Sequence, residues 1–109
     1  MCSIAGGEKI KISPMLEIMK HRSPDGMDFF MDNKFGIGMG RLSIIDLKSE
    51  GLTLYHEDNY YLAFNGEIYN YKELRKEIGG QFRTESDTEV LLKAYKKWGV
   101  DCLDKLNGM

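Results

Sequence analysis

The sequence predicts an α+β fold on the strength of three observations. Residues 35–40 alternate a large apolar residue with glycine, which is the period of two expected of a β-strand. Residues 86–99 open with Ser-Asp-Thr-Glu and end at glycine, as a capped helix does. The expected elements follow the order β, α, β, β, α, α, α, and this lack of strict alternation favours α+β over a doubly wound fold.

The first part of the chain predicts a strand near Cys2 and then one helix. Ser13 is the expected N-cap of that helix, and Pro14 is its expected first residue, where the missing N–H donor costs nothing. We expect the helix to end near Lys20. Residues 21–26 are rich in turn formers and predict a loop.

Two apolar runs predict the central strands. In the strand at 35–40, one face carries only glycine, which suggests close approach by another backbone or a ligand. Residues 41–46 continue or follow this strand. A further strand is expected from Tyr60 to Phe64. Asn65-Gly66 at its end is typical of a tight hairpin turn, and the alternative is an oxyanion hole built from the asparagine amide and the glycine N–H.

The second half predicts three helices. Asn70 and Glu73 resemble a capping box that opens a helix ending at Gly79-Gly80. The helix that Ser86 opens carries an apolar stripe and ends at Gly99; the stripe consists of Leu91, Ala94, Tyr95 and Trp98. A last short helix is expected from Asp101 through Leu106.

Composition limits the class of protein. The chain has 109 residues, which suits one small domain. The formal net charge of −2 and the lack of a long basic run disfavour nucleic-acid binding. No apolar stretch approaches the ~20 residues that a membrane helix needs, and the amino end does not resemble a signal peptide. Two cysteines do not make a disulfide framework, so we expect a reducing, cytoplasmic setting.

Cys2 is the most informative single position. If Met1 is removed, Cys2 becomes the first residue, and its free α-amine then lies a few bonds from its own thiol. Such an amine can act as the general base for its own side chain. The alternative is a small buried apolar residue at the start of a strand.

Arg41 and Asp87 each allow two interpretations. Arg41 is either a surface ion-pair partner or, on an apolar strand, a residue that holds a carboxylate through two parallel hydrogen bonds. Asp87 lies in the first turn of a helix, where it either complements the helix dipole or receives a ligand ammonium. We expect Cys102 to be a core residue without a catalytic role.

Five motifs in order carry a resemblance to a known family. The motifs are Met1–Gly6, His21–Gly26, Arg41–Leu47, Phe64–Tyr71 and Ser86–Leu92. Together they resemble the glutaminase domain of glutamine-dependent asparagine synthetases, a type-2 glutamine amidotransferase with an N-terminal nucleophile. The resemblance implies a sandwich of antiparallel sheets flanked by helices, which this chain would form in part.

The resemblance also implies roles for individual residues. Cys2 is the nucleophile that attacks the side-chain amide of L-glutamine, and Asn65 with Gly66 forms the oxyanion hole. Arg41 binds the substrate α-carboxylate, and Asp87, helped by Glu67, receives the α-ammonium. The substrate pocket is lined by Leu42, Ser43, Ile44 and Ile45. The implied reaction forms a thioester, releases ammonia and ends with hydrolysis to glutamate.

Two serines depart from the family pattern. Ser3 stands where the family usually has glycine after the nucleophile, and Ser23 replaces another common glycine. A side chain at position 3 either crowds the oxyanion region or is tolerated, and the sequence leaves both outcomes open.

The resemblance sets expectations for domains and partners. Residues 1–109 correspond to part of the amidotransferase domain, and the ATP-dependent synthetase domain is not included. No cofactor and no metal is expected in this chain, since ATP and magnesium belong to the synthetase domain that makes asparagine from aspartate. Expected partners are L-glutamine, a synthetase domain or chain, and a second copy in a homodimer. The alternative function is a catalytically silent module that binds glutamine or associates with a partner chain.

Overall fold

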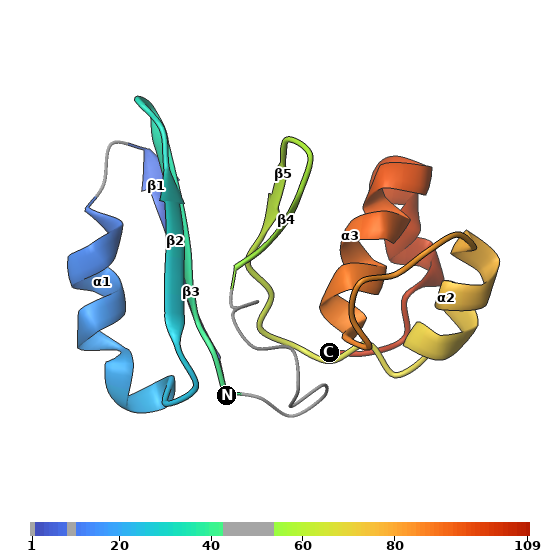
Figure 1. Cartoon of the computed structure of the whole chain (residues 1–109), viewed down its shortest axis with the longest axis horizontal. Coiled ribbons are helices and arrows are strands. Elements are labelled where there is room, and N and C mark those ends of the chain that lie inside the picture. Colours follow the sequence, from blue (N-terminus) through green and yellow to red (C-terminus); the bar gives the residue numbers. More distant parts are fainter. Residues whose placement is uncertain (1, 9–10, 43–53) are drawn as a thin grey trace. The chain divides into compact units, whose positions relative to one another are not determined.

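The computed structural model describes residues 2–8, 11–42 and 54–109 and divides into two compact units, Met1–Asn65 and Gly66–Met109 (Figure 1). The first unit contains β1 (Ser3–Glu8), α1 (Ile12–Ile18), η1 (Lys20–Arg22), β2 (Met27–Met31), β3 (Phe35–Gly40), β4 (Tyr55–Glu57) and β5 (Tyr60–Leu62). The second contains α2 (Tyr71–Ile78), α3 (Asp87–Trp98) and η2 (Gly99–Lys105), where η denotes a 3-10 helix. Antiparallel sheets with helices confirm the predicted α+β class.

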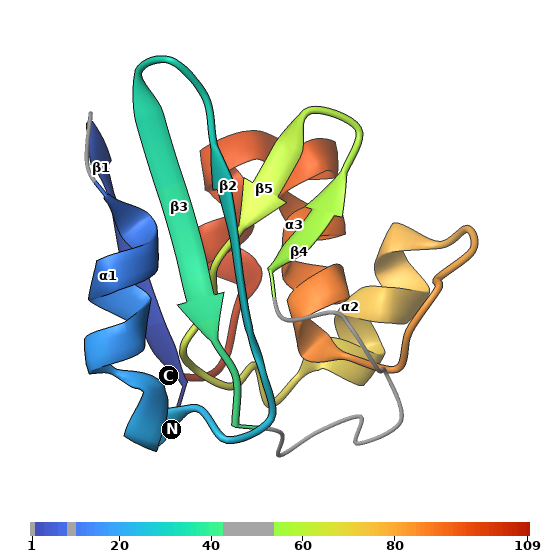
Figure 2. The same ribbon diagram turned by 60° about the vertical axis from the view of Figure 1, so that its left-hand side comes forward.

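The main sheet of the first unit has the order β1-β3-β2, with both pairs antiparallel (Figure 2). Gly40 of β3 lies opposite Ser3 on one side and Met27 on the other. The β2–β3 turn is closed by Asp32, whose Oδ1 accepts hydrogen bonds from the backbone N–H groups of Lys34 and Phe35 at 2.8 and 2.7 Å. These two bonds hold the pKa of the Asp32 carboxyl below its ordinary value.

The glycine face of β3 packs against helix α1. A Cβ added to Gly36 would lie 2.6 Å from Cγ1 of Ile12, and one added to Gly38 would lie 2.8 Å from Cδ1 of Leu16. The expectation of a second backbone or a ligand at the described part of this face is therefore wrong. Ile12 and Leu16 are buried here and form the core with Ala5.

Helix α1 begins earlier than the sequence predicts. Its N-cap is Lys11, which makes no side-chain capping bond, so the predicted cap at Ser13 is wrong. Ile12 is fully buried against the sheet, and burying its side chain outweighs the capping preference of serine. Pro14 becomes the third helical residue, where its missing N–H still breaks no intrahelical bond.

Gly38→Ala is expected to destabilise the protein by about 1–3 kcal/mol, because the new methyl group overpacks the contact with α1. Gly6→Ala is the matched control on the neighbouring strand, since its Cβ would make ordinary contacts at 3.4 and 3.8 Å. Urea unfolding monitored by circular dichroism measures both variants. Equal midpoints for the two variants would contradict the packing described here.

Strands β4 and β5 form a short hairpin, with Tyr55 opposite Leu62. Its turn is Asp58-Asn59, and Asp58 adopts a left-handed φ of 54°, which aspartate tolerates better than most residues. Asn65-Gly66 lies beyond the end of β5, so the hairpin interpretation of that pair is wrong. The strand predicted for residues 60–64 also ends two residues earlier, at Leu62.

The hairpin contacts the main sheet within the first unit. Phe30 of β2 stacks on Tyr61 of β5 with ring centroids 3.9 Å apart. Phe29, its neighbour along β2, lies on the opposite face, since its Cβ is 3.1 Å from the place that a Cβ at Gly38 would occupy, on the side that α1 covers. Helix α1 and the hairpin therefore pack on opposite faces of the sheet, which agrees with part of the expected sandwich.

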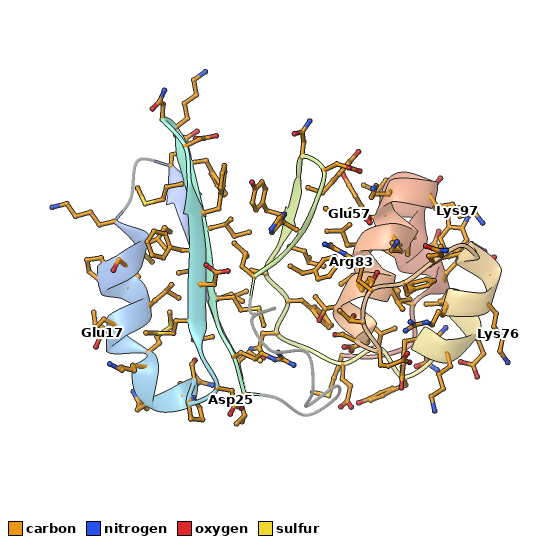
Figure 3. The ribbon with its side chains drawn as sticks, in the orientation of Figure 1. Glu17, Asp25, Glu57, Lys76, Arg83 and Lys97 are labelled. Carbon is orange, nitrogen blue, oxygen red and sulfur yellow. The ribbon has the colours of Figure 1, made fainter. Side chains whose placement is uncertain are left out.

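In the second unit, α2 and α3 have close to the predicted bounds. The capping prediction for α2 is wrong, because the Asn70 side chain donates to the carbonyl of Lys105 and accepts from the N–H of Asn107 instead. At the other end of α2, Nζ of Lys97 on α3 donates to the carbonyls of Glu77 and Ile78 at 2.9 and 3.2 Å (Figure 3). This lysine thus satisfies carbonyls that the end of the helix leaves open.

Helix α3 is capped as predicted, since Oγ of Ser86 accepts from the N–H of Thr88 at 3.1 Å. The buried side is rotated from the predicted stripe and includes Val90, Leu92 and Ala94, whereas Tyr95 is 46% exposed. The last helix is a 3-10 helix that begins at Gly99 and not at Asp101. Within the described residues, no helix has the length and apolar character needed to cross a membrane.

Candidate active site

Cys2 is half-buried and immediately precedes β1. The backbone N–H of Leu42 donates to its Sγ at 3.4 Å, and the thiol donates to the carbonyl of Leu42 at 3.5 Å. Leu42 follows the end of β3, so these contacts join the first residues of the chain to the segment that leaves the sheet. The candidate nucleophile is thereby held at one end of β3.

The backbone of Arg41 is held at the same end of the sheet. Its N–H donates to the carbonyl of Gly26 at 2.8 Å, and its carbonyl accepts from the N–H of Asp25 at 3.1 Å. The turn that contains Asp25 lies just before β2 (Figure 3). Arg41 and Leu42 are both half-buried. The contacts of Cys2 and the backbone bonds of Arg41 therefore both involve the two residues that directly follow β3.

In the second unit, Asp87 is buried and tied to the segment that carries Glu67. Its Oδ2 accepts from the N–H of Ile68 at 2.9 Å. The N–H of Glu67 donates to the carbonyl of Met109 at 2.8 Å, and the N–H of Met109 donates back to Glu67 at 2.9 Å. The segment after Gly66 is thus fixed by Asp87 and by the last residue of the chain.

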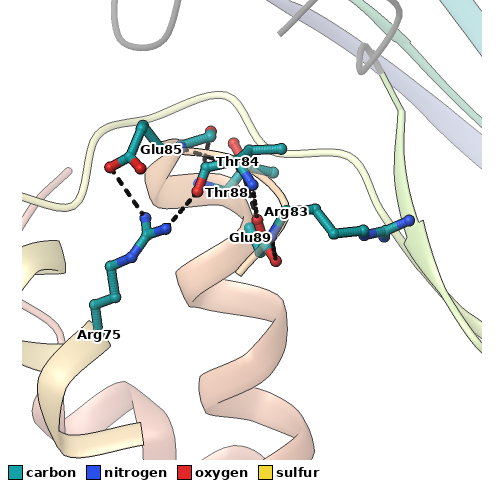
Figure 4. Close-up of polar contacts among 7 residues, drawn as sticks. Arg75, Arg83, Thr84, Glu85, Thr88 and Glu89 are labelled. Carbon is teal, nitrogen blue, oxygen red and sulfur yellow. Dashed lines mark hydrogen bonds and ion pairs between the residues drawn. The ribbon is translucent and has the colours of Figure 1, made fainter. Parts of the chain in front are cut away.

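A buried carboxylate organises the loop that precedes Asp87. Glu89 is fully buried, and its oxygens accept from the N–H of Arg83 at 2.8 Å, the N–H of Thr84 at 2.7 Å and the hydroxyl of Thr84 at 2.8 Å (Figure 4). Arg75 of α2 donates to the carbonyl of Thr84 at 2.6 Å. The sequence predicted Glu89 only as part of a capping box, but its side chain accepts hydrogen bonds from the preceding loop.

The predicted site residues divide between the two units. The first unit holds Cys2, Arg41, Leu42 and Asn65, and the second holds Gly66, Glu67 and Asp87. Ser43, Ile44 and Ile45, predicted to line the pocket, lie outside the described residues. Asn65 is exposed and follows β5 without belonging to a strand. Sequence reasoning missed the bond from Ile68 to Asp87, for which no local motif provides a signal.

The second cysteine has a different environment. Cys102 is 1% exposed, and burial raises the pKa of its thiol, with a further increase from the charge of Asp101. A raised thiol pKa disfavours the thiolate form that acts as a nucleophile. The expectation that Cys102 is a core residue is confirmed. Among the described residues, no group of three or more His, Cys, Asp or Glu side chains could hold a metal ion.

Comparisons with known proteins agree with the arrangement of motifs. The glutamine amidotransferase domain family matches residues 1–109. Asparagine synthetase [glutamine-hydrolyzing] 1 of Bacillus subtilis is 47% identical over 102 residues, which cover 90% of this chain and 16% of that relative. Asparagine synthetase B [glutamine-hydrolyzing] of Escherichia coli is 38% identical over 121 residues, covering 100% and 22% respectively.

A third relative is also an asparagine synthetase by name. A putative asparagine synthetase of Methanocaldococcus jannaschii is 36% identical over 136 residues, covering 100% of this chain and 26% of that relative. The chain therefore spans between 16% and 26% of the length of these three curated relatives.

Proposed function

Because the chain belongs to the glutamine amidotransferase domain family, we propose that it hydrolyses L-glutamine to L-glutamate and ammonia with Cys2 as the nucleophile. The family match over residues 1–109, with a cysteine directly after Met1, is the observation that carries this proposal. The contacts of the Cys2 sulfur with Leu42 support it, because they hold the thiol beside the segment that carries Arg41.

The proposed chemistry begins when removal of Met1 frees the α-amine of Cys2. The amine takes the thiol proton, and the sulfur attacks the side-chain carbonyl carbon of glutamine. A C–S bond forms, the C–N bond breaks, and the leaving nitrogen takes a proton as it departs as ammonia. Water then attacks the thioester, which releases glutamate and returns the thiol.

Each tetrahedral intermediate carries a negative oxygen that needs donors. We assign this role to the side-chain amide of Asn65 and the N–H of Gly66, which are adjacent in the chain. Removing one such donor in other enzymes costs about 2.7–4 kcal/mol of transition-state stabilisation. The bonds that fix Glu67 to Met109 support this role, because they limit the motion of the residue that follows Gly66.

The two ends of the substrate backbone need opposite charges. Arg41 binds the α-carboxylate, Asp87 with Glu67 receives the α-ammonium, and residues 42–45 line the pocket. The bond between Asp87 and Ile68 supports this assignment, because it brings the aspartate carboxylate to the residue next to Glu67. A carboxylate has about four acceptor positions, so one backbone bond leaves capacity for an ammonium.

The printed names of the relatives support a proposal for the use of the released ammonia. Two of them are named asparagine synthetase [glutamine-hydrolyzing], and we assign the ammonia to ATP-dependent synthesis of asparagine from aspartate. This chain covers a small share of those proteins. We therefore assign asparagine synthesis, with its ATP and magnesium, to a synthetase domain or chain that acts as the partner. A homodimer stays a prediction.

The test of the proposed function is release of glutamate and ammonia from L-glutamine by the chain that begins at Cys2, with L-asparagine as the control substrate. The expected result is turnover of glutamine in clear excess over asparagine. Calorimetric binding of glutamine without any turnover would overturn the proposal and favour the catalytically silent binding module.

The ammonium-binding role of Asp87 makes a separate prediction. Asp87→Asn keeps an oxygen acceptor for the N–H of Ile68 but removes the charge, so it should raise KM for glutamine by about 10–100-fold, the value of one charge-assisted hydrogen bond. Wild-type protein should prefer glutamine over glutaramate, which lacks the α-amine, and the variant should lose this preference. If Asp87→Asn still preferred glutamine over glutaramate as strongly as wild type does, Asp87 would not be the residue that binds the α-ammonium.

A further inference from the structure

A pair of buried serine hydroxyls lies beside the first strand. Oγ of Ser3 and Oγ of Ser23 are 2.7 Å apart, and the two residues are 4% and 3% exposed. Gly40 makes room for them, because a Cβ there would lie 2.6 Å from Oγ of Ser3. The two buried hydroxyls are therefore in direct contact.

The pair joins the strand that follows Cys2 to the turn that holds the backbone of Arg41. Ser3 begins β1 and directly follows Cys2. Ser23 begins the turn that ends at Gly26, and backbone bonds in both directions connect that turn to Arg41. One bond between hydroxyls thus connects the neighbour of the nucleophile to the turn that holds the carboxylate anchor.

The side chain of Ser3 points away from the contacts of Cys2. It lies on the glycine face of β3, which α1 covers, whereas the Cys2 sulfur contacts the backbone of Leu42. The hydroxyl of Ser3 therefore lies between Ser23 and the space beside Gly40.

We propose that Ser3 and Ser23 are a coupled positioning pair that holds the Cys2 sulfur in register with Arg41. The proposal rests on the proposed function for its kinetic consequences. Its physical basis is that a buried hydroxyl is costly when its partner is removed, whereas removal of both partners can be nearly neutral. Replacing one serine should therefore let the end of β1 shift, and replacing the second should relieve much of that effect.

The test is a double-mutant cycle with Ser3→Ala, Ser23→Ala and the double variant, and with exposed Ser13→Ala as the control. Each single variant should lower kcat for glutamine about tenfold, because a small displacement of a reacting group has a large effect on rate. KM should stay within about twofold, because the groups that bind glutamine remain. The double variant should recover to within about threefold of wild type.

A second readout does not depend on turnover. The rate of Cys2 alkylation by iodoacetamide, followed by peptide mass spectrometry, should change about threefold or more in each single variant and return toward wild type in the double variant. Buried Cys102 serves as the internal reference. An inactive wild-type chain would contradict the proposed function, and the alkylation cycle would still test the pair.

Two results would overturn the coupling. One is that the two single effects multiply in the double variant, which means that the serines act independently. The other is a lower unfolding midpoint with kcat and alkylation unchanged, which means that the pair only stabilises the fold. If the single alanine variants do not fold, the double variant Ser3→Gly/Ser23→Gly, which removes both hydroxyls, must fold and match wild-type alkylation. Failure of this variant as well would refute the proposal.

Discussion

Cys2→Ala is expected to lower glutamine turnover by on the order of 10⁴-fold or more, the scale seen when an enzyme loses its nucleophile. Glutamate release measures the effect, and the unfolding midpoint shows whether the fold is retained. The reason for the loss is that alanine supplies no atom to form the thioester. This is the largest effect on activity that we expect from a single substitution.

Cys102→Ala is the matched control for that experiment. Cys102 is the other cysteine of the chain and is buried in the second unit. Its replacement leaves a small cavity, which lowers stability by about 1 kcal/mol, but turnover should stay close to wild type. Comparable glutamate release by wild type and Cys2→Ala would exclude Cys2 as the nucleophile.

Glu89→Ala is expected to lower the free energy of unfolding by about 3–5 kcal/mol, the range found when one partner of a buried charged network is removed. The substitution leaves the N–H groups of Arg83 and Thr84 and the Thr84 hydroxyl without the carboxylate that now accepts their hydrogen bonds. Because a small domain is stable by only about 5–15 kcal/mol, the loss is a large share of the total.

Glu85→Ala controls for the removal of an acidic residue from the same loop. Its side chain is 84% exposed and lies 3.6 Å from Arg75, and surface ion pairs contribute at most about 1 kcal/mol. Urea unfolding of both variants measures the difference. Similar midpoints for Glu85→Ala and Glu89→Ala would mean that the buried network does not hold the loop before α3.

Elements with local signals were predicted well. The strand at residues 35–40 has the predicted bounds because its alternation is visible in the residues themselves. Helices α2 and α3 both end where glycine follows the last helical turn. Each of these signals depends on neighbours within a few positions, and tertiary contacts do not oppose it.

Elements that depend on distant partners were missed. Strand β2 contains adjacent Phe29 and Phe30, so it shows no period of two, and it forms because β3 offers an edge to pair with. The glycine face of β3 predicted close approach by another backbone or a ligand, because nothing in the sequence indicated that side chains of α1 would fill it. Asn65-Gly66 resembles a hairpin turn locally, but the segment that follows pairs with residues near Met109.

The candidate site was likewise predictable in its residues but not in the contacts that hold them. Its residues could be named from the order of the motifs, through the resemblance to a family. The hydrogen bonds that hold these residues could not be predicted, because Asp87 and Ile68 are separated by 19 positions in the sequence and Cys2 and Leu42 by 40. Contacts over such distances arise from packing, and no short pattern in the sequence encodes them.

In the proposed reaction, this chain hydrolyses glutamine through a Cys2 whose α-amine is free. Its most direct test compares glutamate release by the processed chain, which begins at Cys2, with release by the same chain retaining Met1, each verified by intact mass. We predict turnover by the processed form and none above background by the form with Met1. Equal turnover by both forms would show that the reaction does not need the free α-amine of Cys2.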